Sequence, residues 1–357
     1  MSKNTEAIKI GSAYVGVVVG AGFSTGQEVL KFFTNYGTYS YLAILISGLM
    51  LAFFGREITK IGQGLDADSH ESAINYLFGE KFGKVIDYVL VFFLYAISVI
   101  MLAGAGSAFN ESFGVPIWLG SLIMMILVII TLMMDFNKIV NALGLVTPFL
   151  ITVVTIIAIY FFFNGDLSFS EVNSHIDTEK QPSKLWWWDG ILYGGLAFST
   201  AFSMLTAIGG DSSRKVIAGR GGTIGGIILL ILLLMVNSGL LAELDKVKDS
   251  PIPSLVLGRM IHPLLSIVLS IIMLTVIYNT IVGLMYSFVA RFTEPYSKKY
   301  IMLLVGTMLV GYFLSFIGFI DLVGKLYPAM GYIGILLCLG IFVKYVVRKS
   351  KGKKHIA

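Results

Sequence analysis

Residues 20–28, Gly-Ala-Gly-Phe-Ser-Thr-Gly-Gln-Glu, place glycines, hydroxyls and an acid within an apolar segment near the N-terminus. Glycine in a helix interior costs about 1 kcal/mol relative to alanine, and an ionisable group at membrane depth usually marks a working site. The segment therefore predicts an interrupted helix, unwound from about Gly20 to Thr25. Its second half, starting near Gly26, would present N–H groups that suit a carboxylate, and its first half would end in carbonyls that suit a cation. A zwitterion such as an amino acid carries both charges.

The composition places this segment in a membrane. Of the 357 residues, 56% are hydrophobic and only 13% are charged, which excludes an ordinary soluble domain. The apolar runs are continuous rather than alternating, which favours helices over a β-barrel. We therefore expect an all-α integral membrane protein. The chain has a single cysteine and scattered histidines, so we expect no metal site. It has no nucleotide-binding loop, and we do not expect an enzyme.

Ten stretches are long enough to cross a bilayer core of roughly 30 Å, which needs about 20 apolar residues per helix. The predicted spans are 8–33, 39–60, 84–109, 115–134, 138–163, 188–210, 219–242, 262–290, 300–318 and 321–346. Basic residues gather before the first span and after the even-numbered spans, which places both termini, including the basic tail 347–357, in the cytoplasm. Because topology and anionic lipid account for the net charge of +5, no nucleic-acid partner is expected.

Three of the segments that connect the spans have sequence patterns that predict a particular structure. Residues 69–78 have the pattern of a short amphipathic helix, which would lie on the inner surface. Residues 164–187 form a polar outer loop. Residues 243–261 contain Pro251, Pro253 and an apolar stretch too short to span, which suggests a helix folded down over an outer cavity.

The two halves of the chain repeat short motifs in the same order. Phe-Ser-Thr occurs at 23–25 in the first span and at 198–200 in the sixth. The pattern Asn/Asp-x-Leu/Val-Gly-x-Leu/Val-x-Pro occurs at 141–148 in the fifth span and at 321–328 in the tenth. Because five spans per repeat is an odd number, the second half must enter the membrane from the opposite side. This predicts an inverted repeat of residues 1–163 and 188–346, with a site near the midplane built from interrupted first and sixth helices.

The predicted substrate site lies where these two helices are interrupted. The aromatic rings that would close it are Phe23, Phe198 and Phe202. The hydroxyls that would supply hydrogen bonds are those of Ser24, Thr25, Ser199 and Thr200. The small residues that would expose the backbone are Gly20, Ala21, Gly22 and Gly26. The alternative interpretation is that the small residues merely allow helices to pack closely.

At this point the chain resembles a known group. Ten spans in a five-plus-five arrangement, with Gly-Ala-Gly in a broken first helix, resemble the amino acid–polyamine–organocation superfamily with the LeuT-type fold. The motif at 20–28 is similar to that of the YkvI-like bacterial membrane proteins. The resemblance implies a multi-pass protein of the bacterial plasma membrane that transports an amino acid or related amine by alternating access. The alternatives are a ligand-sensing receptor, since spore germinant-receptor subunits share the superfamily, and a channel.

The resemblance also implies individual roles. A tyrosine of the third span, here Tyr95, would meet the substrate carboxylate; the alternative is that Tyr95 is a tyrosine of the core. A sodium ion would bind between first-span carbonyls at Gly20 and Phe23 and the side chains of Asn279 and Thr280 in the eighth span. No other cofactor is expected. Some sodium-independent relatives use a lysine in the middle of the fifth span, where this chain has only Lys138 at the inner end, which favours sodium over proton coupling.

Glu28 follows the predicted interruption and should point towards the outer vestibule. In some relatives a basic residue there pairs with an acid of the tenth span to form an outer gate. Here Lys325 would supply the opposite charge, giving a gate pair of reversed polarity. Two alternatives remain: Glu28 pairs locally with Lys31 while Lys325 extends to the surface, or Glu28 carries a coupling proton.

Overall fold

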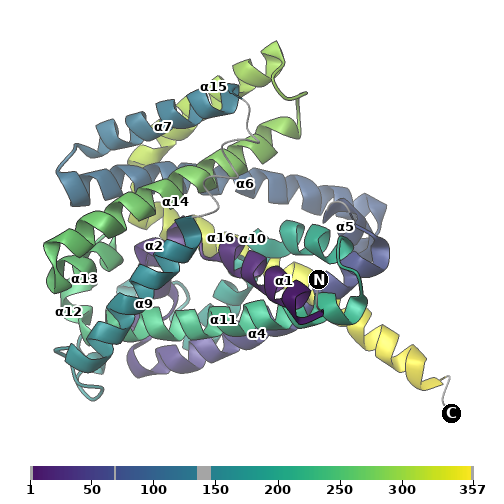
Figure 1. Cartoon of the computed structure of the whole chain (residues 1–357), viewed down its shortest axis with the longest axis horizontal. Helices are drawn as coiled ribbons and strands as arrows, with labels where there is room; N and C mark the ends of the chain where they lie inside the picture. Colours follow the sequence, from purple (N-terminus) through teal and green to yellow (C-terminus); the bar gives the residue numbers. More distant parts are fainter. Residues whose placement is uncertain (1–2, 68–69, 135–145, 355–357) are drawn as a thin grey trace.

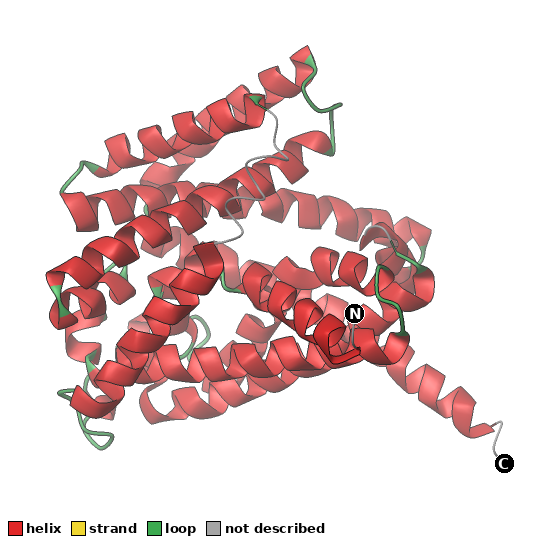
Figure 2. Ribbon diagram, in the orientation of Figure 1, coloured by secondary structure: helices red, strands yellow, loops and turns green. Residues whose placement is uncertain are grey.

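All regular secondary structure in the described part of the chain is helical (Figure 2). The computed structural model describes residues 3–67, 70–134 and 146–354. Seven helices there are long and apolar enough to cross a membrane, and Ile117–Met133 and Pro148–Asn164 are shorter apolar helices. The interrupted first span, the seven long helices and the two shorter ones together account for the ten predicted crossings.

The observed helix ends lie at most five residues from those predicted, except that α16 runs eight residues beyond the predicted end of the tenth span. The first span comprises α1 (Lys3–Val18), α2 (Ala21–Thr25) and α3 (Gln27–Phe32). The others are α4 (Ser40–Leu65), α6 (Glu80–Phe113), α7 (Ile117–Met133), α9 (Val146–Asn164), α10 (Trp186–Gly210), α11 (Lys215–Ala242), α14 (Pro263–Ala290), α15 (Lys298–Leu314) and α16 (Phe319–Lys354). The predicted start of the fifth span, 138–145, lies outside the described residues.

Spans one, two, six and seven form one group. Helices α10 and α11 both pack along α4, and α1 packs along α11. The close approach depends on small residues, because a β-carbon on Gly222 would overlap the backbone of Gly55, and one on Gly226 would overlap that of Ala52. Small residues at such positions are typical of helix pairs in lipid, where backbones approach closely.

Spans three, four, eight and nine form a second group, in which α14 and α7 pack against α6 and α15 joins them. Figure 1 shows α7 and α15 along the upper edge of the molecule and α4 and α11 along the lower edge. Helix α16 packs on α10, and α9 lies against α11 and α14. Helices at equivalent positions of the two predicted halves thus meet, the second span with the seventh and the third with the eighth.

Both termini lie at one end of the molecule, on the right in Figure 1, together with α5 (His70–Phe78). Helices α12 (Leu244–Val247) and α13 (Pro253–Ile261) lie at the opposite end. The two short helices predicted between spans are therefore present. Two termini on one side agree with an even number of crossings.

Candidate functional site

The first span is interrupted twice rather than unwound throughout. Helix α1 ends at Val18, and a left-handed Gly26, with φ 78°, separates α2 from α3. Residues 21–25, which the sequence predicted to be unwound, form the short helix α2 instead. The reason is local: the Thr25 hydroxyl donates to the carbonyl of Gly22 at 2.8 Å and accepts from the backbone N–H of Gln27 at 3.3 Å.

Gly26 is also where the outer helix α13 touches the first span. A β-carbon at this position would lie 2.8 Å from Ser254 Oγ and 3.4 Å from Pro253 Cβ. Both the positive φ and this contact therefore require glycine. Phe23 and Thr25 are only 2% and 1% exposed, so the interruption is closed in this conformation. The segment 243–261, for which we predicted a helix folded down over an outer cavity, thus contacts the first span through α13.

Glu28 turns back over Gly22 instead of pointing outwards. A β-carbon on Gly22 would overlap the Glu28 carboxylate and would lie 2.9 Å from the hydroxyl of Tyr327. Tyr193 of α10 donates to Glu28 Oε2 at 3.3 Å, and Tyr327 of α16 hydrogen-bonds the same carboxylate. Spans one, six and ten thus converge on one acid. Both tyrosines are almost completely buried.

The structure does not bring Glu28 and Lys325 together. Lys325 is exposed, and in the described part of the chain Glu28 forms an ion pair with neither Lys325 nor Lys31. The Lys31 ammonium lies near Gly324 instead, 3.1 Å from where a β-carbon would sit. The predicted gate pair is absent from this conformation because the space above Gly22 lets the carboxylate fold inwards, to two tyrosines.

The predicted interruption of the sixth span is wrong, because α10 is one continuous helix from Trp186 to Gly210. Ser199 and Thr200 donate to the carbonyls of Leu196 and Ala197, each at 2.8 Å, so their hydroxyls are satisfied within the helix. Phe198 and Phe202 are buried with ring centroids 5.9 Å apart.

The glycines of the sixth span serve close packing. A β-carbon on Gly195 would overlap the carbonyl of Gly331 in α16, and one on Gly334 would overlap that of Gly195. Close packing was the alternative interpretation of the small residues, and it holds for this pair of helices.

Two of the residues predicted for sodium do lie side by side. Thr280 Oγ1 and the carbonyl oxygen of Val17 are each 3.8 Å from the position that a β-carbon on Gly20 would occupy. Thr280 Oγ1 donates to Val276 O at 2.9 Å, which leaves its lone pairs available. Asn279 precedes Thr280 on α14 and is half-buried. Oxygen atoms therefore border the free face of Gly20.

Tyr95 does not face the interruption. Its hydroxyl donates to the carbonyl of Thr307 in α15 at 3.0 Å, and its ring stacks on Phe288 at a centroid distance of 5.1 Å. Lys138 lies outside the described residues.

Sequence reasoning missed three side chains of the site. Tyr193 and Tyr327 form hydrogen bonds with Glu28. Tyr193 directly precedes Gly194-Gly195, and Tyr327 directly precedes Pro328. An aromatic residue next to a helix-weakening residue is therefore the sequence pattern that could have identified both. Gln27 is only 4% exposed, and its Oε1 has no hydrogen-bond partner among the described residues. A buried acceptor without a partner calls for an explanation, and a bound ligand is one.

No protein-family model matches the chain. The uncharacterized membrane protein YkvI of Bacillus subtilis (strain 168) is 29% identical to it, over 93% of this chain and 96% of YkvI. The uncharacterized protein YyaD of the same organism is 22% identical, over 94% of this chain and 96% of YyaD.

Two solved structures are similar in fold. A mutant of the Eremococcus coleocola manganese transporter superposes with a TM-score of 0.61 at 16% identity, over 95% of this chain and 79% of that one. MhsT in complex with L-phenylalanine superposes with a TM-score of 0.60 at 14% identity, over 94% of this chain and 97% of MhsT. The chain is thus a multi-span membrane protein homologous to YkvI, with the LeuT-type fold that it shares with MhsT.

Proposed function

We propose that this protein is a secondary transporter of a small zwitterionic solute, an amino acid or related amine, that works by alternating access. The observation that carries the proposal is the interrupted first span, which meets Tyr193 of α10, Thr280 of α14 and Tyr327 of α16 at residues 20–28. Interrupted helices at such a meeting point are the usual binding sites of transporters with repeated halves. The manganese transporter, a protein of similar fold, supports transport as the activity.

The groups around the interruption favour an ammonium group as part of the substrate. Glu28 forms no ion pair among the described residues, and Gln27 Oε1 is a buried acceptor without a partner there. A carboxylate held away from water is costly unless a cation or hydrogen bonds compensate for it. One carboxylate, one amide and several hydroxyls suit an ammonium group. A manganese ion also accepts oxygen ligands, but the described residues contain no cluster of three His, Cys, Asp or Glu side chains that could hold a metal ion. That MhsT binds L-phenylalanine is in line with an amino acid.

For the coupling ion we propose sodium. The oxygen atoms of Thr280 and Val17 beside Gly20 are hard ligands of the kind that a sodium ion accepts. The second candidate is a proton carried by Glu28. It is favoured by the position of this acid, which lies between two tyrosine hydroxyls and makes no ion pair among the described residues.

Reconstitution into liposomes tests both proposals. Labelled amino acids and amines are offered under an inward sodium gradient, an inward proton gradient or neither. We expect accumulation under the sodium gradient, and we expect Glu28→Gln to lower the initial rate about tenfold or more, because it removes the charge that meets the ammonium group. Glu294→Gln, which neutralises an exposed acid between α14 and α15, should leave the rate unchanged.

Other outcomes would point elsewhere. Uptake driven by a proton gradient alone, with Glu28→Gln insensitive to that gradient, would replace sodium by proton coupling. Ligand-dependent thermal stabilisation without flux would contradict transport and indicate a sensor. Single-channel currents in a planar bilayer would indicate a channel.

A further inference from the structure

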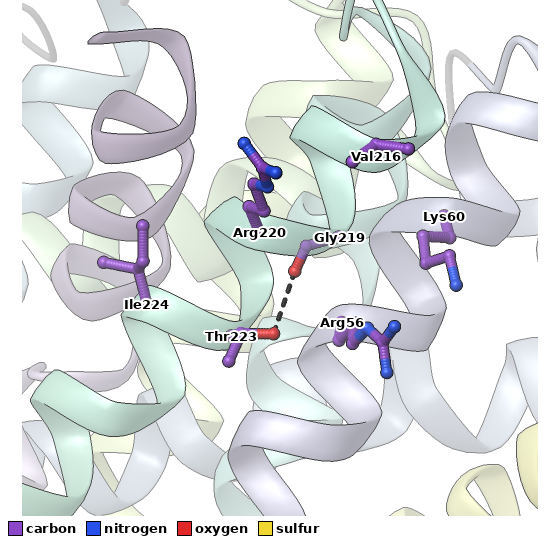
Figure 3. A pocket seen from close by; sticks show the side chains of 7 residues that line it. All are labelled: Arg56, Lys60, Val216, Gly219, Arg220, Thr223 and Ile224. Carbon is purple, nitrogen blue, oxygen red and sulfur yellow. Dashed lines mark hydrogen bonds between the residues drawn. The ribbon is translucent and has the colours of Figure 1, made fainter. Parts of the chain in front are cut away.

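A surface cavity of about 360 Å³ lies where the end of α4 meets the start of α11, and none of its lining residues belongs to the first span (Figure 3). Arg56 and Lys60 line it from α4 and Arg220 from α11. Gly219 lies between them: a β-carbon there would be 2.8 Å from Lys60 Cδ and 3.4 Å from Arg56 Cγ. The absence of a side chain at Gly219 therefore lets the stems of both cations lie against α11.

The cavity carries a surplus of positive charge. Its lining includes three cations and no acid. The carboxylate behind it is Glu57, which is 1% exposed; its Oε1 accepts from Lys60 at 3.2 Å and lies 3.9 Å from Arg56 Nε, while its Oε2 accepts from Arg348 at 2.7 Å. Arg220 forms no ion pair within the described ranges. The three cations that line the cavity therefore face a single carboxylate behind it, which Arg348 also shares.

Both helices also expose aliphatic side chains on the same face as a cation of the cavity. On α11, the residues seven and eleven positions after Arg220 are Ile227 and Ile231, which are 46% and 50% exposed. On α4, the residues seven and eleven positions before Arg56 are Leu49 and Leu45, which are 60% and 45% exposed. Spacings of seven and eleven keep residues on one helix face. Each helix thus presents a cation at its end and exposed aliphatic side chains below it, towards the middle of the membrane.

We propose that this cavity binds the phosphate group of an anionic phospholipid, with the acyl chains lying along the exposed aliphatic faces of α4 and α11. Guanidinium groups bind phosphate oxygens through paired, charge-assisted hydrogen bonds, and basic pockets between transmembrane helices are suited to anionic headgroups. A soluble phosphate compound would share the polar contacts but would make no use of the apolar faces. By the distribution of basic residues, the lipid comes from the inner leaflet.

The test measures lipid binding to the full-length protein in neutral detergent. Phosphatidylglycerol, phosphatidylcholine with the same acyl chains, and inorganic phosphate are titrated separately, and thermal unfolding and native mass spectrometry report binding. We expect phosphatidylglycerol to stabilise the protein more than the other two. We expect the double variant R56Q/R220Q to weaken its apparent affinity about tenfold or more, because two charge-assisted contacts are lost.

The matched control is K298Q/K299Q, which removes the same charge from two exposed lysines at the start of α15 and should bind as the unmodified protein does. If R56Q/R220Q does not fold, R220Q alone serves, because Arg220 forms no ion pair among the described residues that would be broken. Equal affinity of R56Q/R220Q and the unmodified protein overturns the proposal. So does equal stabilisation by phosphatidylcholine, or by inorganic phosphate, which would assign the cavity to a soluble anion.

Discussion

At the scale of single residues, the shape of the site depends on glycines, whose missing side chains leave space for neighbouring groups. The Glu28 carboxylate occupies the volume that a β-carbon on Gly22 would take, and Ser254 of α13 that of one on Gly26. At Gly20 the oxygen of Thr280 lies 3.8 Å from the β-carbon position, an ordinary contact distance. The glycines therefore both weaken the helix and admit the groups that make the site polar.

Gly22→Ala should strongly lower the initial rate of transport while leaving the protein folded. The added methyl group would occupy the place of the Glu28 carboxylate, which would have to leave both tyrosines. We expect the initial rate to fall at least about tenfold, in line with the loss of a charged contact. Gly16→Ala in the same span is the control, since nothing lies within 4 Å of its β-carbon position. Equal rates in the two variants would contradict the assigned role of this space.

Thr280→Val should raise the sodium concentration needed for half-maximal uptake about tenfold, because valine keeps the shape of threonine and removes the oxygen beside Gly20. Thr275→Val is the matched control. Thr275 donates to Ile271 O at 2.7 Å, just as Thr280 donates to Val276 O, so both variants lose the same kind of intrahelical hydrogen bond. Sodium dependence that is unchanged in Thr280→Val would remove this residue from the ion site.

Local features of the site were predictable from the sequence, and its long-range partners were not. The interruption around Gly20 and Gly26 follows from helix propensity alone. The partner of Glu28 does not, because Tyr193 is 165 positions away and the charge of Lys325 made it the obvious candidate. A carboxylate can be held by hydroxyl donors as well as by a cation, and the sequence does not show which of them folding brings near.

At the scale of elements, α10 shows how the same residue types can have a different role. The Ser-Thr pair and the glycines of the sixth span predicted an interruption by analogy with the first. In α10, however, the hydroxyls bond within the helix, and Gly195 provides the surface on which α16 packs. Composition alone does not separate a broken helix from a closely packed one, because both need small residues.

Gly334→Ala should lower the melting temperature of the protein by several degrees. Its β-carbon would overlap the carbonyl of Gly195, and overpacking of this kind costs about 1–3 kcal/mol. Gly306→Ala in α15 is the control: nothing lies within 4 Å of that position, so the change should be neutral or stabilising by up to about 1 kcal/mol. Thermal unfolding in detergent measures both, and equal melting temperatures would contradict the close packing of α10 on α16.

At the scale of the whole molecule, the number and limits of the spans were predictable because the bilayer thickness sets the length of each apolar run. Which spans pack against each other was harder to predict from the sequence. That α4 packs against both α10 and α11 depends on small residues spread over three helices, which no single segment displays. A long connection is also held in place, because Lys180 of the loop between α9 and α10 forms an ion pair with Asp249, just before α13.

Loss of this outer connection should loosen α13. Lys180 donates to Asp249 and to the carbonyl of Lys248 at 2.9 Å, and this contact holds the pKa of Asp249 below its usual range. The stabilisation is therefore complete above the unfolded pKa of about 3.9 and is lost as the pH falls through the lower, folded value. Because the pair is exposed, we expect a local effect, measured as faster amide exchange in α13 at low pH or in Asp249→Asn.

Asp245→Asn is the control for this prediction, since Asp245 is exposed on the neighbouring α12 and forms no ion pair among the described residues. Exchange in α13 that is unchanged in Asp249→Asn would show that the outer helix is held by its apolar contacts alone.

The pairing of α4 with α11 also sets an order of events during synthesis. When α4 has entered the membrane, the small-residue face that it will bury has no partner until α11 is made, some 177 residues later by the ends of the two helices, Leu65 and Ala242. At a translation rate of about 5–20 residues per second, this interval lasts on the order of tens of seconds. During that time the face of α4 that α11 will cover is exposed to lipid or to the insertion machinery. A nascent chain that stops before Lys215 is therefore a membrane-inserted but incompletely packed species, and a natural substrate for quality-control proteolysis.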